Sequence, residues 1–188
     1  APLRDMNFIL FDVLGIQDSA NAIPAYAEAT AETVTAILDE AGKFCTHVLQ
    51  PINRGGDEAG CKLENGAVRT APGFKEAYKK FVEGGWPGLA CDPAYGGQGL
   101  VTPVSFAVEE MLSSANMAFG LVPLLTHGAY HALKAHATEE LRNTYLSKMV
   151  AGTWTGTMNL TEPQCGTDLG LIKTRAEPQP DGTYKIFG

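Results

Sequence analysis

The spacing of apolar side chains changes near residue 152. Before that point apolar residues recur every three or four positions, as they do on one face of a helix. From Pro24 to Gln50 this spacing predicts one helix, which we expect Pro51 to end and a polar, glycine-containing loop to follow. Further helices are predicted over residues 73–82, 103–112, 117–133 and 138–152, which makes five or six within residues 1–152.

Two of these segments carry additional signals. Nearly every residue from Met117 to Leu133 is apolar or small, so we expect other helices to surround that one. Between the first two predicted helices, the Asn65-Gly66 pair predicts a tight turn.

After Gly152 apolar and polar residues alternate instead. The two-residue period from Trp154 to Leu160 predicts a strand with one apolar and one polar face. A second strand is expected over Leu171–Ala176, which leads through the turn sequence PQPDG into TYKIFG as the opening of a hairpin. The chain is therefore mainly α, with the first strands of a β domain at its end. Because two or three strands are marginal alone, we expect it to be the front part of a longer polypeptide.

Composition and charge narrow the possible functions. The formal net charge of -7 is spread along the 188 residues, which argues against a nucleic-acid partner. No stretch is long and apolar enough to cross a bilayer, and the first residues resemble neither a signal peptide nor a transit peptide, so we expect a cytoplasmic protein. The four cysteines lie far apart and are expected to be buried or partly buried free thiols.

A cluster of hydrogen-bond donors is expected where the first predicted strand ends. Pro163 stops ladder pairing and Gly166 lets the backbone turn, which leaves backbone N–H groups beside the hydroxyls of Thr161 and Thr167. Neutral donors in such a cluster suit an anionic or electron-rich ligand edge. Composition alone favours a plainer interpretation, an ordinary loop between strands with solvated acids.

The same segment carries a family resemblance. MNLTEPQCGTD, from Met158 to Asp168, resembles the flavin-binding signature of acyl-CoA dehydrogenases, an apolar strand followed by Thr-Glu-Pro, two variable residues, Gly, Ser or Thr, and Asp. YGGQG, EEM and GTWTGTMNLTEP are similar to the 3-(methylthio)propionyl-CoA dehydrogenase branch, and the opening APLRDMNFIL resembles its N-terminal extension. The resemblance covers essentially the whole chain but only the front third of a family member.

The resemblance implies a domain plan and a cofactor. The helical N-terminal domain would occupy residues 1–152, with the extension at about 1–30, and residues 153–188 would begin a β-barrel-like middle domain that a helical C-terminal domain follows. FAD is the implied cofactor, and the residues implied to bind it are Met158, Asn159, Leu160, Thr161, Gly166 and Thr167. Thr167 would also reach the acyl-CoA.

The implied reaction is α,β-dehydrogenation of an acyl-CoA thioester in fatty acid metabolism. A base removes the α proton, a hydride leaves the β carbon for the flavin, and an electron-transfer flavoprotein reoxidises it. The family's base lies in the C-terminal domain, so we expect no catalytic base in this chain, no activity of the chain alone, and a homodimer or homotetramer at full length. Two alternatives stay open: an acyl-CoA oxidase or monooxygenase of the same fold, and a helical interaction module without cofactor.

Other candidate residues have plainer explanations. Leu121 and Leu125 are implied to line the acyl pocket, although a helix core accounts for them more simply. His127 and His131 share one helical face, but no third ligand lies near, and no metal site is expected. The glycines after Tyr95 lack the lysine and the preceding strand of a P-loop and predict a turn.

Overall fold

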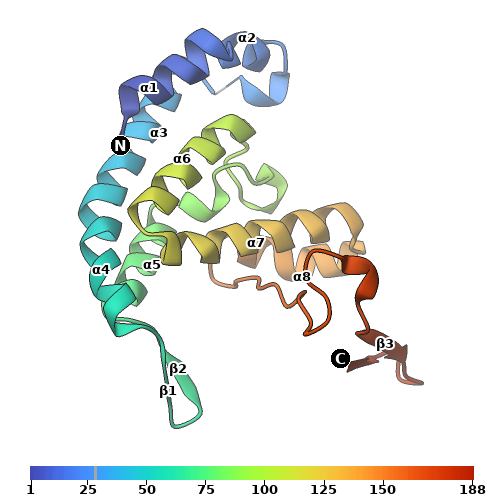
Figure 1. Cartoon of the computed structure of the whole chain (residues 1–188). Coiled ribbons are helices and arrows are strands. Elements are labelled where there is room, and N and C mark those ends of the chain that lie inside the picture. Colours follow the sequence, from blue (N-terminus) through green and yellow to red (C-terminus); the bar gives the residue numbers. More distant parts are fainter. Residues whose placement is uncertain (28) are drawn as a thin grey trace. The chain divides into compact units, whose positions relative to one another are not determined.

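The computed structural model describes residues 1–27 and 29–188, which form two units, Ala1–Thr157 and Met158–Gly188. Figure 1 shows the elements of both units. The α-helices are α1 (Leu3–Asn7), α2 (Ile16–Asn21), α3 (Ala31–Phe44), α4 (Gln50–Ala59), α5 (Phe74–Glu83), α6 (Thr102–Ala115), α7 (Met117–His136) and α8 (Glu139–Val150). The strands are β1 (Lys62–Glu64), β2 (Ala67–Arg69), β3 (Arg175–Pro178) and β4 (Tyr184–Phe187).

Short helical segments of other types complete the first unit. Two are π-helical, Phe8–Val13 and Cys45–Leu49, and three are 3₁₀ turns, Pro24–Tyr26, Trp86–Gly88 and Pro93–Tyr95. The described residues thus contain more helices than the five or six expected, chiefly because helical segments also occur between Leu3 and Tyr26. None of the helices in residues 1–27 and 29–188 combines the length and apolar character needed to cross a bilayer.

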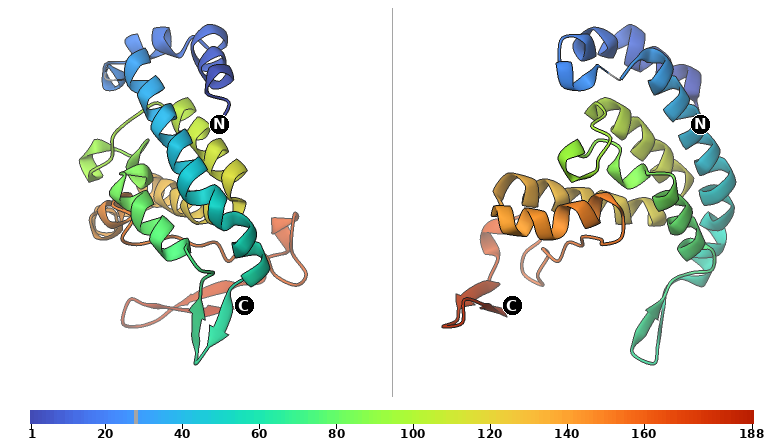
Figure 2. Two further views of the ribbon diagram at one scale, coloured as in Figure 1. Left: turned by 90° about the vertical axis from the view of Figure 1, so that its left-hand side faces the viewer. Right: turned by 180° about the vertical axis from the view of Figure 1, so that it is seen from behind.

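The helix expected from Pro24 to Gln50 begins later and ends later. Thr30 caps α3 by accepting a hydrogen bond from the Thr33 N–H at 3.1 Å, while residue 28 of the expected span lies outside the described residues. From Ala31 the chain stays helical through the π turn and α4 to Ala59, and Figure 2 shows this long helix from two further sides. The glycines at 55 and 56, expected in a loop, therefore lie in a helix.

Pro51 does not end this helix, and the π turn before it explains why. The Gln50 N–H donates to the Cys45 carbonyl, five residues back instead of four. Proline has no N–H and its ring collides with the carbonyl four residues earlier in a regular α-helix. The wider π turn reorganises the hydrogen bonds just where Pro51 would disrupt them. A local distortion thus replaces the expected stop.

The core of the first unit lies between α3, α5, α6 and α7. Val34, Leu38, Leu49 and Val104 are fully buried there. An aromatic group adjoins them, in which Phe81 and Phe119 meet edge to face with ring centroids 5.5 Å apart. A smaller cluster between α7 and α8 is built on Tyr130, Leu146 and Met149. The helices predicted from apolar spacing therefore bury the faces that the spacing indicates.

Buried Asn116 connects the corner between α6 and α7 to the long helix. Its side-chain oxygen accepts from the Phe119 N–H at 3.1 Å and so caps α7. Its Nδ2 donates to the Leu49 carbonyl at 3.4 Å, beside the π turn. One side chain therefore fixes both the start of α7 and its distance from the long helix.

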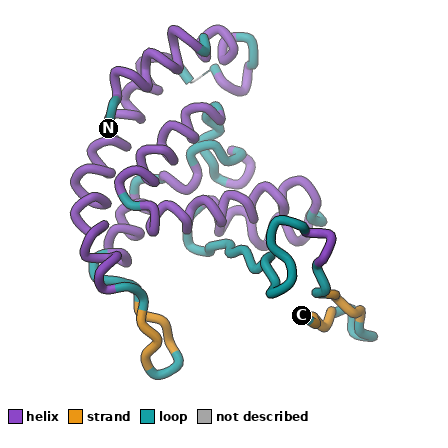
Figure 3. The backbone as a smooth tube through the Cα atoms, in the orientation of Figure 1, coloured by secondary structure: helices purple, strands orange, loops and turns teal. Residues whose placement is uncertain are grey.

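The predicted turn at Asn65-Gly66 is confirmed. Both residues have positive φ, 52° and 78°, as a type I′ hairpin turn requires, and Glu64 pairs with Ala67 across it. The hairpin β1–β2 is exposed along its whole length, and Figure 3 shows it as a separate pair of strands. Its short strands leave the helical core untouched.

The strand expected over Trp154–Leu160 does not form. Residues 154–160 belong to no strand, and Gly156, in the first unit, donates its N–H to the Thr126 hydroxyl at 3.2 Å instead of to a ladder partner. A two-residue period specifies faces, but a strand also needs a neighbouring strand with which to pair. In the second unit the hairpin is present as β3–β4, although its first strand begins at Arg175 and not at Leu171.

The Asn116 brace leads to a stability prediction. Asn116→Ala removes a cap and leaves the buried Leu49 carbonyl without its side-chain donor, so we expect a loss of about 2 kcal/mol in the free energy of unfolding. Urea denaturation followed by circular dichroism measures it. Thr138→Ala is the matched control, because Thr138 caps α8 from an exposed position and should cost about half as much. Equal losses in the two variants would contradict the bracing role.

Candidate functional site

The second unit presents a loop of free hydrogen-bond donors. Glu162 and Cys165 exchange two backbone hydrogen bonds of 3.0 Å, which closes a tight turn and sets Thr161 beside Gly166. Among the hydrogen bonds within the described part of the chain, the backbone N–H groups of Thr161, Gly166 and Thr167 donate none. We call residues 161–168 the donor loop.

Glu162 holds the donor loop in shape. Its carboxylate accepts from the backbone N–H groups of Lys173 and Thr174 at 3.0 and 2.9 Å and from the Gln164 amide. The interactions with Thr174 and Lys173 lower the pKa of Glu162 to about 2. Glu162 is therefore ionised at neutral pH and acts as a structural brace. The plainer interpretation of this segment, an ordinary loop with solvated acids, does not describe Glu162.

Cys165 and Asp168 complete the loop's internal bonding. Cys165 is buried, and its thiol donates to the Asp168 carbonyl at 3.0 Å. The Asp168 carboxylate accepts from the Gly170 N–H at 3.0 Å and caps the 3₁₀ turn Leu169–Leu171. The acids and the thiol thus bond to the backbone, whereas the hydroxyls of Thr161 and Thr167 point to no protein acceptor among the described residues.

The residues expected to bind the cofactor are open to a ligand. Met158 and Leu160 are 63% and 41% exposed, and Asn159, Thr161 and Thr167 are exposed as well. A methyl group built on Gly166 would meet no atom within 4 Å. A flat ligand can therefore approach the backbone at Gly166 closely.

The first unit contains an apolar cavity of about 360 Å³ between α5 and α7. Its walls are mainly aromatic and aliphatic, and they are formed by Thr70, Phe74, Lys75, Tyr78, Phe119, Val122 and Thr155. The hydroxyl of Tyr78 donates to the Gly152 carbonyl at 2.9 Å, and burial raises the pKa of Tyr78. The Tyr78 side chain therefore stays uncharged, and its hydrogen bond holds it in the cavity wall. The cavity suits an apolar chain.

A neighbouring groove of about 860 Å³ shares Thr70, Phe74 and Val122 with this cavity. Leu121, one of the two expected wall residues, lines the groove, whereas Leu125 is half-buried and lines neither space. The expectation that other helices surround α7 is wrong, because Leu121 and Val122 are 46% and 41% exposed. The sequence missed Phe74 and Tyr78, whose apolar spacing marked them only as core.

His127 forms an ion pair inside the first unit. Its Nδ1 lies 2.9 Å from Glu109 Oε1 and its Nε2 lies 3.0 Å from the Pro87 carbonyl oxygen. Both ring nitrogens face acceptors, so both must donate, which requires the imidazolium form. Burial opposes the charge, but the bonds to Glu109 and Pro87 outweigh it and raise the pKa of His127. The pair joins α6 and α7 to the 3₁₀ turn at Trp86.

The remaining candidate residues show no ligand chemistry. No group of three or more metal-binding side chains occurs in residues 1–27 and 29–188, and His127 is already engaged by Glu109. In the glycine-rich segment after Tyr95, Gly97 and Gly99 donate their N–H groups to Asp92 and Cys91, so these donors are not free for a phosphate. This segment is a turn, as expected.

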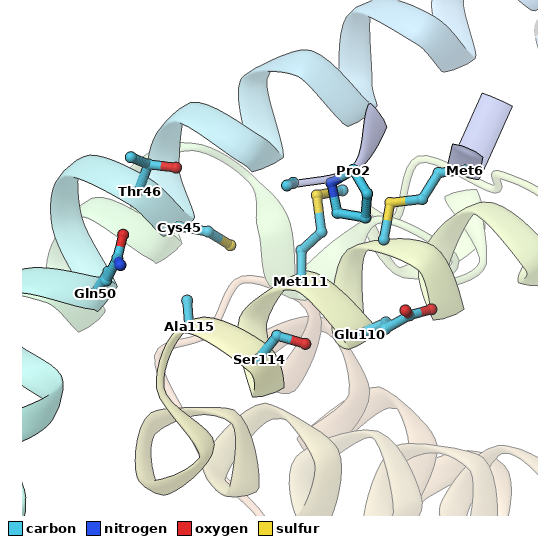
Figure 4. A pocket seen from close by; sticks show the side chains of 10 residues that line it. Pro2, Met6, Cys45, Thr46, Gln50, Glu110, Met111, Ser114 and Ala115 are labelled. Carbon is cyan, nitrogen blue, oxygen red and sulfur yellow. The ribbon is translucent and has the colours of Figure 1, made fainter. Parts of the chain in front are cut away.

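A smaller cavity of about 250 Å³, shown in Figure 4, is bordered by sulfur-containing side chains, Met6, Cys45 and Met111. Burial raises the pKa of Cys45 to about 11, so its thiol stays protonated and unreactive. The expected free thiols are present at all four positions, but Cys61 is exposed and not buried.

Comparison with known proteins identifies the family. The family model described as acyl-CoA dehydrogenase, N-terminal domain, matches residues 31–153. The chain belongs to the acyl-CoA dehydrogenase family. It therefore shares its evolutionary origin with enzymes of that name, and the helical first unit corresponds to their N-terminal domain.

Named acyl-CoA dehydrogenases align with the whole chain. It is 43% identical over 188 residues to 3-methylmercaptopropionyl-CoA dehydrogenase of Ruegeria pomeroyi, covering 100% of this chain and 32% of the relative. It is 38% identical over 193 residues to a butyryl-CoA dehydrogenase of Syntrophomonas wolfei, covering 99% of this chain and 31% of the relative. The chain thus spans about a third of the length of these relatives.

Solved structures show the same fold. An acyl-CoA dehydrogenase from Bacillus anthracis, crystallised in complex with FAD, superposes with a TM-score of 0.66 at 24% identity, over 86% of this chain and 26% of that one. The expected fold, a helical acyl-CoA dehydrogenase N-terminal domain, is confirmed.

The His127 ion pair predicts a pH dependence with a definite sign. The folded pKa of His127 is raised above its usual 6.5, so its contribution to stability is complete below that value and is lost as the pH rises through the folded pKa. We expect wild type to lose stability relative to His127→Gln as the pH rises above about 6.5. Urea denaturation at each pH measures the difference.

The neighbouring histidine provides the control. Burial and the charge of His127 lower the pKa of His131, so its contribution has the opposite sign, present at high pH and lost as the pH falls. His131→Gln should therefore shift the pH profile in the other direction. The same profile in both variants would contradict the assigned imidazolium.

Proposed function

We propose that the protein containing this chain is an FAD-dependent acyl-CoA dehydrogenase that oxidises a short acyl-CoA across its α and β carbons. Family membership supports the reaction, since the aligned relatives are named dehydrogenases of 3-methylmercaptopropionyl-CoA and butyryl-CoA. The observation that carries the proposal is the donor loop, in which free backbone N–H groups coincide with the residues expected to bind flavin.

The residues of the donor loop fit FAD. The free N–H groups of Thr161, Gly166 and Thr167 and two exposed hydroxyls offer neutral donors to the polar edge of a flavin or to a pyrophosphate. The open space at Gly166 allows a flat ring to approach the backbone. When bound, FAD supplies the acceptor for the hydride. In this proposal Met158, Asn159 and Leu160 would help to hold FAD, and residues 153–188 would begin the domain that binds it.

The chain's own contribution to the reaction is binding, orientation and charge stabilisation. Donors fixed by the Glu162 brace can stabilise negative charge that develops at the flavin without reorganising. Thr167 is proposed to reach the acyl-CoA as well. The apolar cavity and the groove beside Leu121 can take up the acyl chain and exclude water from it.

We assign no catalytic base to this chain. The carboxylate of Glu162 is ionised and engaged by backbone donors, and that of Glu109 is paired with His127. A general base needs an accessible carboxylate with a pKa closer to the operating pH. The base is therefore proposed to lie in a part of the protein outside these residues.

The rest of the proposal concerns partners and setting. Electrons must leave the reduced flavin, and we propose an electron-transfer flavoprotein as their acceptor. We also propose a cytoplasmic homodimer or homotetramer with a role in fatty acid metabolism.

An anaerobic absorbance titration tests the proposed function. The full-length protein should show flavin bands between about 300 and 550 nm that bleach when 3-(methylthio)propionyl-CoA or butyryl-CoA is added. Slow reoxidation by air afterwards supports a dehydrogenase, and rapid reoxidation without a partner protein would show an oxidase or monooxygenase. Protein without flavin bands would contradict the proposal.

Thr161→Val tests the donor loop itself. The substitution removes one exposed hydroxyl donor and keeps the side chain's shape, so we expect flavin reduction to slow by about tenfold to a hundredfold with unchanged folding. Stopped-flow absorbance measures the rate. Thr157→Val, also at an exposed position, is the control and should leave the rate within about twofold. Equal rates in both variants would remove Thr161 from the site.

A further inference from the structure

The apolar cavity and the neighbouring groove share three wall residues, of which Phe74 is the largest. Both spaces have Thr70, Phe74 and Val122 in their walls, so the two spaces adjoin at these three residues. Thr70 is exposed outside the helices and Val122 is held within α7. Phe74 is the largest of the three and is only half-buried. Its ring is therefore the largest side-chain surface that the two spaces have in common.

Close packing at two glycines positions this ring and the start of its helix. A Cβ atom on Gly56 of α4 would come within 2.5 Å of Phe74 Cε2 and 2.8 Å of its Cζ, so the ring lies directly over the helix backbone. Next to it, Gly73 at the start of α5 has φ +87°, and a Cβ there would come within 2.8 Å of Ile52 on α4. The start of α5 is thus packed tightly against α4. This packing fixes the position of the Phe74 backbone, from which the ring extends.

The other aromatic walls of the cavity are anchored more firmly. The hydroxyl of Tyr78 is bonded to the Gly152 carbonyl, and Phe119 is 3% exposed and packs edge to face on Phe81. Phe74 has no polar anchor, and its ring is bounded on one side by the bare backbone at Gly56. Among these walls, Phe74 can change position at the lowest cost.

We propose that Phe74 sets the acyl-chain length that the protein accepts. With the ring over Gly56, the cavity of about 360 Å³ is closed toward the groove and takes a short acyl group. Removal of the ring joins the cavity to the groove of about 860 Å³, which gives a long apolar chain a continuous path. This inference rests on the proposed function, because it assigns the cavity to the acyl chain.

The test compares chain lengths in the full-length holoenzyme. For Phe74→Ala we expect the ratio of kcat/KM for dodecanoyl-CoA to kcat/KM for butyryl-CoA to rise by about tenfold or more over wild type, since additional methylenes become buried. Phe74→Leu should give a smaller rise in this ratio. It keeps the test decisive if the alanine variant does not fold. Calorimetric binding of the non-oxidisable thioethers dodecyl-CoA and butyl-CoA should show the same shift without catalysis.

Two adjacent glycines provide a matched pair of opposite variants. Gly56→Ala places a methyl group where the Phe74 ring lies and should push the ring into the cavity. We expect activity to fall most with dodecanoyl-CoA and less with butyryl-CoA. Gly55→Ala adds the same methyl group to the same helix where no atom lies within 4 Å, so its chain-length profile should match wild type.

The possible outcomes separate this inference from the proposed function. Wild type that oxidises butyryl-CoA, together with an unchanged chain-length ratio in both Phe74 variants, would overturn the role of Phe74 and leave the dehydrogenase intact. The same profile in Gly56→Ala and Gly55→Ala would also overturn it. Wild type that reduces no flavin with any acyl-CoA would overturn the proposed function and this inference with it.

Discussion

The hydrogen bond from buried Asn116 to the Leu49 carbonyl holds the helical unit in its arrangement. It reaches the long helix beside the π turn that accommodates Pro51, and the same side chain starts α7. Further along the long helix, α5 packs against α4 through close contacts at Gly56 and Gly73. The walls of the apolar cavity come mainly from α5 and α7, and both helices contact the long helix.

Local chemistry in the sequence predicted much of this framework. Apolar spacing predicted the helices and Asn65-Gly66 predicted a tight turn, because each signal acts over a few residues of the same segment. The motif from Met158 to Asp168 pointed to the donor loop in the same way, since free donors follow from a proline and a glycine close together.

The errors arose where distant residues decide the outcome. A proline normally stops a helix, yet the turn before Pro51 rearranges its hydrogen bonds and the helix continues. A two-residue period over Trp154–Leu160 formed no strand, because the N–H of Gly156 bonds to α7. Likewise, Phe74 read as ordinary core, since neither its contact with Gly56 nor its place between two cavities is visible in a linear pattern.

The ion pair between His127 and Glu109 also affects the register in which α6 and α7 pack against each other. Apolar faces tolerate sliding by one turn, because one aliphatic contact replaces another at little cost. A half-buried imidazolium does not, since a slipped helix would separate it from Glu109 and from the Pro87 carbonyl and leave its charge without a partner. We infer that this pair excludes misaligned packings of the two helices and so selects a single register for α7 during folding.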